Sequence, residues 1–195
     1  MEQFFIKGTN DELFVTFHGQ GGYEYSLLFI TSELNPFSNI ITYLGNYNKG
    51  DRRRFFKPIK DGKRDIVDFE ERINKFLENW NTIDLTNYKK ITFIGYSNGA
   101  NFILGLLEKN PDIADKTILL HPSDLHWDFT KKATKNKILA TVGSQDIISN
   151  PGKILNMQKQ YSKTIFPTFD IKLLDSGHEV RDDEVDVVKE WYLSN

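Results

Sequence analysis

The sequence predicts an α/β protein whose mostly parallel β-sheet carries helices on both faces. Short apolar runs, rich in β-branched and aromatic residues, alternate with longer stretches of helical periodicity, as in parallel strands joined by helical crossovers. A length of 195 residues fits one domain that can bury a full core and carry a cleft. No repeat, low-complexity tract or linker divides the chain, so we expect a single domain over residues 1–195.

Each predicted element follows from a local pattern. Strands are expected where apolar residues run without helical spacing, at 13–17, 39–44, 90–94, 116–120, 137–142 and 169–174. Helices are expected where apolar residues recur every three or four positions, at 25–33, 65–80, 98–108, 152–161 and 182–193. Residues 45–64 lack periodicity, which predicts a long, lid-like loop. Because this loop follows a strand, we expect it at the edge of the sheet where α/β proteins bind ligands.

Composition excludes several classes of function. The 25 basic and 27 acidic residues leave a net charge of -2, which gives no reason to expect nucleic acid or an anionic membrane as partner. The chain has no cysteine, so disulfides, a thiol nucleophile and a cysteine-ligated metal are excluded. The first residues lack the features of a signal peptide, and no run of about 18 apolar residues could span a bilayer. We therefore expect a cytoplasmic protein.

The most informative motif is Gly95-Tyr96-Ser97-Asn98-Gly99, a Gly-x-Ser-x-Gly pattern between a predicted strand and a predicted helix. A nucleophile elbow needs this strand–turn–helix context, since the turn aims the serine hydroxyl away from the sheet. Small residues are needed on both sides because strand and helix crowd together there. The alternative is a plain turn in which Ser97 caps the helix. The context favours Ser97 as a nucleophile.

A serine nucleophile needs a base, and the base needs an orienting carboxylate. In a sheet of this kind the order along the chain is serine, acid, histidine, each after a strand. His178 directly follows the last predicted strand, which favours it as the base. Asp146, just past the preceding strand, is the favoured acid. Asp124 and Asp128 remain rivals, whereas Asp175 is too close to His178 in sequence to be its partner.

Stabilising the oxyanion of a tetrahedral intermediate requires two main-chain N–H groups. One is expected from Asn98, directly after the nucleophile. The other is expected from Gln20 in the turn 18–22, whose glycines allow a close approach to the elbow. His18, at the start of that turn, is expected to be a buried hydrogen-bonding strut rather than a base.

With these residues identified, the chain resembles the α/β-hydrolase superfamily. Within it, the chain looks like the phospholipase/carboxylesterase branch of small bacterial esterases, with dienelactone-hydrolase-like enzymes as near relatives. The motifs that carry the resemblance are His18-Gly19-x-Gly21-Gly22, Gly95-Tyr96-Ser97-Asn98-Gly99-Ala100-Asn101, His121-Pro122, Gly143-x-x-Asp146 with Pro151, and Gly177-His178. The resemblance implies the α/β-hydrolase fold and a carboxylesterase that acts without a cofactor on small or medium acyl esters. Its triad would be Ser97, Asp146 and His178.

The sequence departs from these relatives at two points. Many of them have two glycines before the base histidine, whereas here Ser176 precedes Gly177. Dienelactone hydrolases proper use a cysteine nucleophile, which this chain lacks, so lactone hydrolysis is not expected as its native reaction. The same triad would serve a thioesterase or a lysophospholipase. A hydrolase homologue that binds a ligand without turnover is a further alternative.

Two loops at the predicted catalytic edge would shape substrate choice. In loop 45–64, Arg54 would bind an acidic or phenolic group of the substrate and Phe55 would contact the acyl group. The alternative is a solvated basic loop whose aromatic side chains are buried in the core. His121 and Trp127 follow another strand and would line the pocket. A metal at His121 and His126 is not expected, because no third ligand has suitable spacing. The expected partner is a small-molecule ester, and a homodimer is left open.

Overall fold

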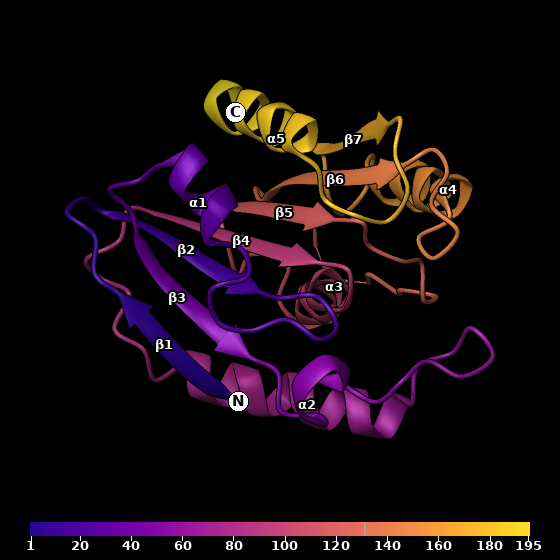
Figure 1. The fold of residues 1–195 in the computed structure, drawn as a ribbon, viewed down its shortest axis with the longest axis horizontal. Helices are drawn as coiled ribbons and strands as arrows, with labels where there is room; N and C mark the ends of the chain where they lie inside the picture. The colour runs from indigo at the N-terminus through magenta and orange to yellow at the C-terminus, as the bar shows by residue number, and fades with distance from the viewer. Residues whose placement is uncertain (131) are drawn as a thin grey trace.

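The computed structural model describes residues 1–130 and 132–195. Seven strands form one sheet in the order β1-β3-β2-β4-β5-β6-β7 (Figure 1). Every neighbouring pair is parallel except β1 and β3, which are antiparallel. The strands are β1 (Glu2–Ile6), β2 (Glu12–Phe17), β3 (Asn39–Leu44), β4 (Lys90–Tyr96), β5 (Lys116–Leu120), β6 (Lys137–Gly143) and β7 (Phe169–Leu174). The predicted mostly parallel sheet is confirmed.

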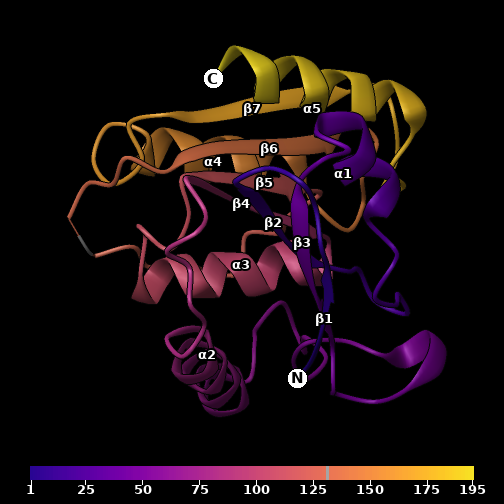
Figure 2. The ribbon, with the colours of Figure 1, turned by 90° about the vertical axis from the view of Figure 1, so that its left-hand side faces the viewer.

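Helices cover both faces of the sheet, as predicted. One face carries α2 (Ile66–Trp80), α3 (Asn98–Lys109) and α4 (Pro151–Tyr161), and the other carries α1 (Leu28–Leu34) and α5 (Asp182–Ser194). Figure 2 shows α1 and α5 on one side of the sheet and α2 and α3 on the other. Because both faces are covered, the central strands are continuous apolar runs rather than alternating ones.

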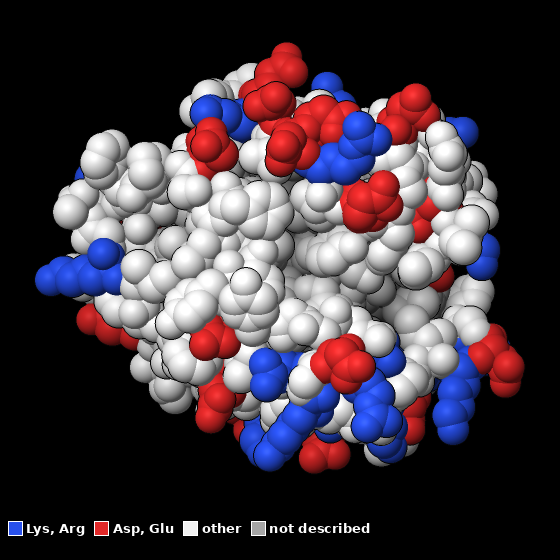
Figure 3. All heavy atoms as spheres, in the orientation of Figure 1, with Lys and Arg blue, Asp and Glu red and all other residues white. Residues whose placement is uncertain are grey.

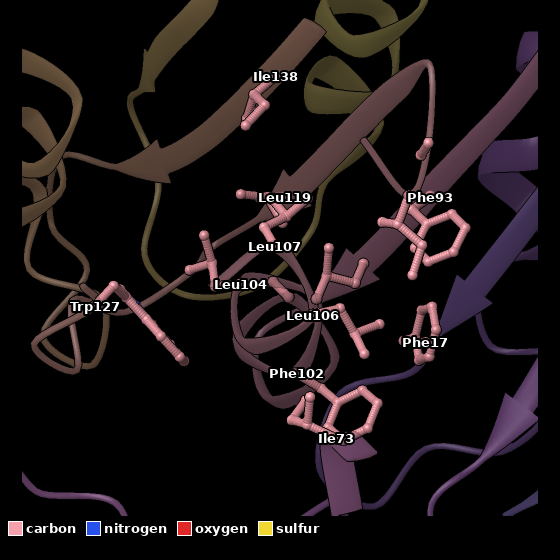
Figure 4. Close-up of a cluster of buried hydrophobic side chains, with 14 of the residues drawn as sticks. Phe17, Ile73, Phe93, Phe102, Leu104, Leu106, Leu107, Leu119, Trp127 and Ile138 are labelled. Carbon is pink, nitrogen blue, oxygen red and sulfur yellow. The ribbon is translucent and has the colours of Figure 1, made fainter. Parts of the chain in front are cut away.

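The larger core lies between the sheet and the helices α2, α3 and α4. The ring of Phe17 on β2 lies with its centroid 5.7 Å from that of Phe93 on β4 and 5.8 Å from that of Phe102 on α3 (Figure 4). Helix α3 is buried along its length from Asn98 to Leu107, because the sheet lies on one side of it and α2 on another. The residue that follows the predicted nucleophile therefore belongs to the best-anchored helix of the fold.

Two elements differ from expectation. β1 is not among the predicted strands, because it is a short edge strand whose side chains are mostly exposed. α1 begins at Leu28 rather than at Tyr25, since residues 23–27 form tight turns in which Ser26 and Leu28 donate to the carbonyls of Tyr23 and Tyr25. Those turns place apolar residues at helical spacing without forming a helix. The other predicted boundaries agree with the structure to within two residues.

The face drawn in Figure 3 has an uncharged, hollowed middle and charged side chains of both signs toward its rim. This mixture fits the nearly balanced composition of 25 basic and 27 acidic residues. Within residues 1–130 and 132–195, no helix is both long enough and apolar enough to cross a bilayer.

Candidate active site

Three residues predicted from the sequence meet beyond the carboxyl ends of parallel strands. Ser97 follows β4, Asp146 follows β6 and His178 follows β7. His178 Nε2 lies 2.8 Å from Ser97 Oγ, and His178 Nδ1 lies 2.8 Å from Asp146 Oδ2. Because an ionised carboxylate only accepts hydrogen bonds, Nδ1 carries the ring proton and Nε2 can accept the proton of the serine hydroxyl. Chemically, this is a serine that an oriented histidine can activate.

Ser97 occupies a sharp turn between β4 and α3. Its φ of 49° is unusual for a residue other than glycine and marks local strain. Its N–H donates to the Leu120 carbonyl at 2.8 Å, and its side chain makes no capping bond to α3. A Cβ at Gly99 would overlap the Phe17 carbonyl, and a Cβ at Gly95 would lie 2.7 Å from main-chain atoms of the first turn of α3. The turn therefore serves to aim the hydroxyl and does not use it as a cap.

Asp146 is held by four hydrogen bonds. Its Oδ1 accepts from the N–H groups of Ile148 and Ser149 at 2.9 and 2.8 Å. Its Oδ2 accepts from Nδ1 of His178 and of His121 at 2.8 and 2.9 Å. Burial raises the pKa of Asp146, but these bonds outweigh burial and hold the pKa below its usual value. Asp146 is therefore an anion at neutral pH.

The rival acids lie elsewhere. Asp124 Oδ1 accepts from the N–H of His126 at 3.0 Å, and the side chain of Asp128 is exposed. Asp175 Oδ1 accepts from the side-chain amide of Gln145 at 3.1 Å. Across the described parts of the chain, the acid that contacts the ring of His178 is Asp146.

Ser97 opens into a cavity of about 310 Å³. The lining residues are Gln20, Arg54, Ile59, Tyr96, Ser97, Asn98, Asn101, Ser123, Ile148 and His178. Asn98 is the first residue of α3, so its N–H has no acceptor within the helix. The N–H of Gln20 has no partner among the residues that the structure describes. Both predicted oxyanion donors are thus available beside the serine.

His18 is the buried strut that the sequence predicts. Its Nε2 accepts from the N–H of Gly45 at 3.0 Å, and its Nδ1 donates to the Gly19 carbonyl at 2.6 Å. Burial lowers the pKa of His18 and so favours the neutral ring, which has one donor and one acceptor as these two bonds require. The ring therefore ties the turn 18–22 to the start of loop 45–64.

Loop 45–64 is tied to the site at two further points. The N–H of Gly21 donates to the Arg53 carbonyl at 2.9 Å. The N–H of Phe55 donates to the side-chain oxygen of Asn98 at 2.8 Å, a buried bond. Residues 53–55 are thereby held between the two turns that supply the predicted oxyanion donors.

Three of the four predicted substrate contacts, Phe55, Trp127 and His121, have side chains that do not line the cavity. Phe55 is 0% exposed and stacks on Phe102 in the core. Trp127 is also buried, and its indole N–H donates to the Ser123 carbonyl at 2.8 Å. His121 is buried and does not line the cavity either. Their position after a strand is as predicted, but the core takes up the apolar side chains. Arg54 is the one of the four that lines the cavity.

A buried glutamate that the sequence analysis does not single out joins the site from α5. His121 Nε2 lies 3.1 Å from Glu184 Oε2, and both side chains are buried. Burial lowers the pKa of His121, but the hydrogen bonds and charges of Glu184 and Asp146 outweigh burial, and the pKa lies above its usual value. An acidic residue in the first turn of a helix is favoured by the helix dipole anyway, so the sequence carries no signal for this contact.

His121, Asp146 and His178 place one side-chain atom each within 4.8 Å of one another. The clustering follows from the hydrogen bonds that both rings make to one carboxylate oxygen of Asp146. His126, the other histidine of the metal site that the sequence does not favour, is exposed and lies outside this group.

No protein-family model matches the chain. The chain is 24% identical to the Bacillus subtilis (strain 168) protein named "Putative hydrolase MhqD", over 98% of each chain. It is similar in structure to Atu2452 of Agrobacterium tumefaciens str. C58, a protein of unknown function, with a TM-score of 0.84, 25% identity and coverage of 97% of this chain and 94% of that one. It is also similar to the Bacillus cereus carboxylesterase, with a TM-score of 0.86, 23% identity and coverage of 100% and 94%.

Proposed function

The chain has the α/β-hydrolase fold, and from that premise we propose that it is a serine hydrolase. The proposed reaction is cleavage of carboxylic esters with small or medium acyl groups through an acyl-Ser97 intermediate. The observation that carries the proposal is the pair of 2.8 Å contacts from Ser97 Oγ to His178 and from His178 to Asp146. The similar proteins that bear the names hydrolase and carboxylesterase support the same reaction class.

The proposed mechanism gives a separate role to Ser97, to His178, to Asp146 and to the two main-chain N–H groups. Ser97 Oγ attacks the ester carbonyl carbon while its proton passes to His178 Nε2, and the N–H groups of Gln20 and Asn98 stabilise the oxyanion. Collapse of the tetrahedral intermediate breaks the bond to the alcohol, which leaves with the proton from His178. Water then attacks the acyl-serine, again losing a proton to His178. When this second tetrahedral intermediate collapses, the bond to Ser97 Oγ breaks, His178 returns the proton to Oγ, and the acid product leaves. Throughout, Asp146 holds the ring in the required tautomer.

A serine activated in this way could also attack a thioester or a lysophospholipid. A protein that only binds its ligand, without turnover, would not need a hydroxyl aligned with a base. A substrate panel of p-nitrophenyl esters, acyl thioesters and lysophospholipids therefore separates these alternatives. We expect turnover of short and medium p-nitrophenyl esters. Preference for thioesters or lysophospholipids would change the substrate class. Ligand-induced thermal stabilisation without any turnover would favour a binding protein.

The nucleophile is tested by intact-protein mass spectrometry after reaction with a fluorophosphonate probe. We expect one adduct on the wild-type chain and none on Ser97→Ala, with hydrolysis of a responsive ester falling by about 10³-fold or more. Ser162→Ala is the matched control, since Ser162 lies at the end of α4 and should label normally. Absence of an adduct on the wild-type chain, or an equal adduct on Ser97→Ala, would refute the assignment.

A further inference from the structure

The cavity beside Ser97 contains one arginine and no carboxylate. Its lining includes Arg54, and none of the other lining residues is aspartate or glutamate. No ion pair of Arg54 is found within residues 1–130 and 132–195. A charged side chain that faces a binding cavity without a counter-ion is a candidate for binding one from the ligand.

The guanidinium of Arg54 is also partly desolvated. Its Nε is buried and has no hydrogen-bond partner among the described residues. Burial lowers the pKa of Arg54, although an arginine side chain stays charged in proteins. A buried donor without a partner costs free energy that a bound acceptor can offset in part, by drawing the guanidinium into new hydrogen bonds.

The main chain around Arg54 is fixed. Arg54 and Tyr47 exchange two main-chain hydrogen bonds of 2.9 and 3.0 Å, and the next residue is bonded to Asn98. A Cβ at Gly45 would lie 2.6 Å from the Arg54 carbonyl group, so these segments pack tightly. The main chain from which the Arg54 side chain enters the cavity is therefore fixed relative to the predicted oxyanion hole, and a specificity group is best placed on such a support.

We propose that Arg54 is an anion-binding subsite, so that the preferred substrates are esters that carry a carboxylate a few bonds from the scissile carbonyl. This inference rests on the proposed function and names its substrate class. A carboxylate can accept two parallel N–H bonds from a guanidinium, which fixes the orientation of the ester as well as its affinity. The carboxylate could belong to the acyl part or to the alcohol part, and the two are separated by the choice of substrate.

Matched esters test the subsite. Monoethyl succinate carries the charge on the acyl side, and its neutral match is ethyl pentanoate. 3-Acetoxypropanoate carries the charge on the alcohol side, and its neutral match is butyl acetate. We expect wild type to prefer one charged ester over its neutral match. Arg54→Gln should lower kcat/KM for that charged ester by about 10- to 100-fold, the range of one hydrogen bond to a charged group, with much less effect on the neutral match. Arg54→Lys should restore part of the loss, and Arg52→Gln, an exposed neighbour, should change neither.

The outcomes separate this inference from the proposed function. If Arg54→Gln lowers kcat/KM equally for the neutral and the charged esters, the anion-binding subsite is refuted, whereas the proposed hydrolase function is not. If no ester is turned over, binding of monoethyl succinate to Ser97→Ala by calorimetry still tests the subsite. Binding that Arg54→Gln does not weaken would overturn it. Failure of the fluorophosphonate probe to label Ser97 would count against the proposed function alone.

Independently of Arg54, the ring of His121 lies between two carboxylates. Nδ1 is 2.9 Å from Asp146 Oδ2 and Nε2 is 3.1 Å from Glu184 Oε2. Since ionised carboxylates only accept, the ring can satisfy both contacts only when both nitrogens carry protons. The raised pKa of His121 likewise favours the doubly protonated ring. A buried imidazolium is thus paired on both sides, as buried charges must be.

This imidazolium shares its acceptor with the predicted base. Asp146 Oδ2 accepts from both His121 and His178, whose ring centroids lie 5.3 Å apart. Among the described residues, Tyr96 also packs against the two rings, and its hydroxyl donates to the His178 carbonyl at 2.8 Å. Burial together with the charges of Glu184, Asp146 and Glu179 raises the pKa of Tyr96 to about 12, so it is neutral. The positive charge on His121 therefore offsets part of the negative charge that Asp146 presents to His178.

We infer that His121 and Glu184 are positioning residues that set the pH range in which His178 acts as a base. Glu184→Gln keeps the shape of the side chain and removes the charge that keeps His121 doubly protonated. Neutral His121 still donates to Asp146. The variant removes the positive charge of His121, which contacts Asp146, and the negative charge of Glu184 on the far side of that ring, so Asp146 acts on His178 with more of its charge. We expect the acidic limb of the activity profile to move to higher pH by roughly 0.5 to 1 unit.

The rate of fluorophosphonate inactivation as a function of pH measures this limb without a known substrate. Glu190→Gln, on the exposed side of the same helix, is the control and should leave the limb in place. If Glu184→Gln does not fold, the double variant His121→Asn/Glu184→Gln replaces it. Asparagine tolerates the φ of 50° at residue 121 and can still donate to Asp146. An unmoved limb in a folded variant, even with a lower overall rate, would mean a purely structural role and would overturn the inference.

Discussion

Asp146→Asn should reduce the rate of acyl-enzyme formation by about 10⁴-fold, because an amide in place of the carboxylate favours the wrong tautomer of His178. In the present structure Nδ1 of His178 donates to Asp146 Oδ2, which leaves Nε2 to accept from Ser97. An asparagine that turns its NH₂ group toward the ring would reverse these roles. The measurement is the rate of fluorophosphonate labelling or of p-nitrophenyl acetate hydrolysis at neutral pH.

Asp124→Asn is the control for this prediction, because Asp124 also follows a strand and bonds only to the N–H of His126 among the described contacts. It should keep nearly full activity. The reverse result, with Asp146→Asn active and Asp124→Asn inactive, would show that the acid is Asp124, after β5, and that the assignment to Asp146, after β6, is wrong. Circular dichroism of both variants would show that the loss is not caused by unfolding.

Gly99→Ala should cause the largest loss of stability among single-methyl additions. The new Cβ would overlap the carbonyl groups of Phe17 and His18, which are main-chain atoms that cannot rotate away. Either α3 or the end of β2 must shift, at a cost on the order of 3 kcal/mol in the free energy of unfolding. For a chain of this length that corresponds to a fall of roughly 10 °C in Tm. Thermal unfolding measured by calorimetry checks it.

Gly152→Ala is the comparison for that stability measurement. Gly152 lies in the first turn of α4, where a Cβ would meet only the Asn150 side chain at 3.2 Å. Alanine should be neutral or slightly stabilising there, within about 1 kcal/mol. If Gly99→Ala were as stable as Gly152→Ala, the close approach of the elbow to β2 would not be the constraint that the geometry indicates.

The sequence predicts the fold and the central groups of the site because both depend on local signals repeated in order. Strand-ending turns mark the positions of Ser97, Asp146 and His178, and parallel strands bring their ends to one edge. The predicted strut His18 lies in a short glycine-containing turn, and the predicted oxyanion donor Asn98 directly follows another, where composition limits the possible conformations.

The remaining features depend on contacts between distant parts of the chain. Glu184 reaches His121 across 63 residues, and no local pattern marks Glu184 as its partner. The position of Phe55 and Trp127 after strands predicts pocket residues, but the space that they fill is set by packing against α2 and α3. Direction of a loop side chain, into the core or into the cavity, is a tertiary property that single-sequence patterns do not contain.

The hydrogen bond from Phe55 N–H to the side chain of Asn98 has a consequence for how this scaffold can diversify. Because Arg53 also binds the turn 18–22, a change in length between residues 45 and 55 would displace main-chain groups on both sides of the reacting centre. Insertions and deletions there are therefore costly to catalysis, unlike those in most surface loops. New specificities would arise by exchanging side chains such as Arg54 on a loop of constant length, with the chemistry left untouched.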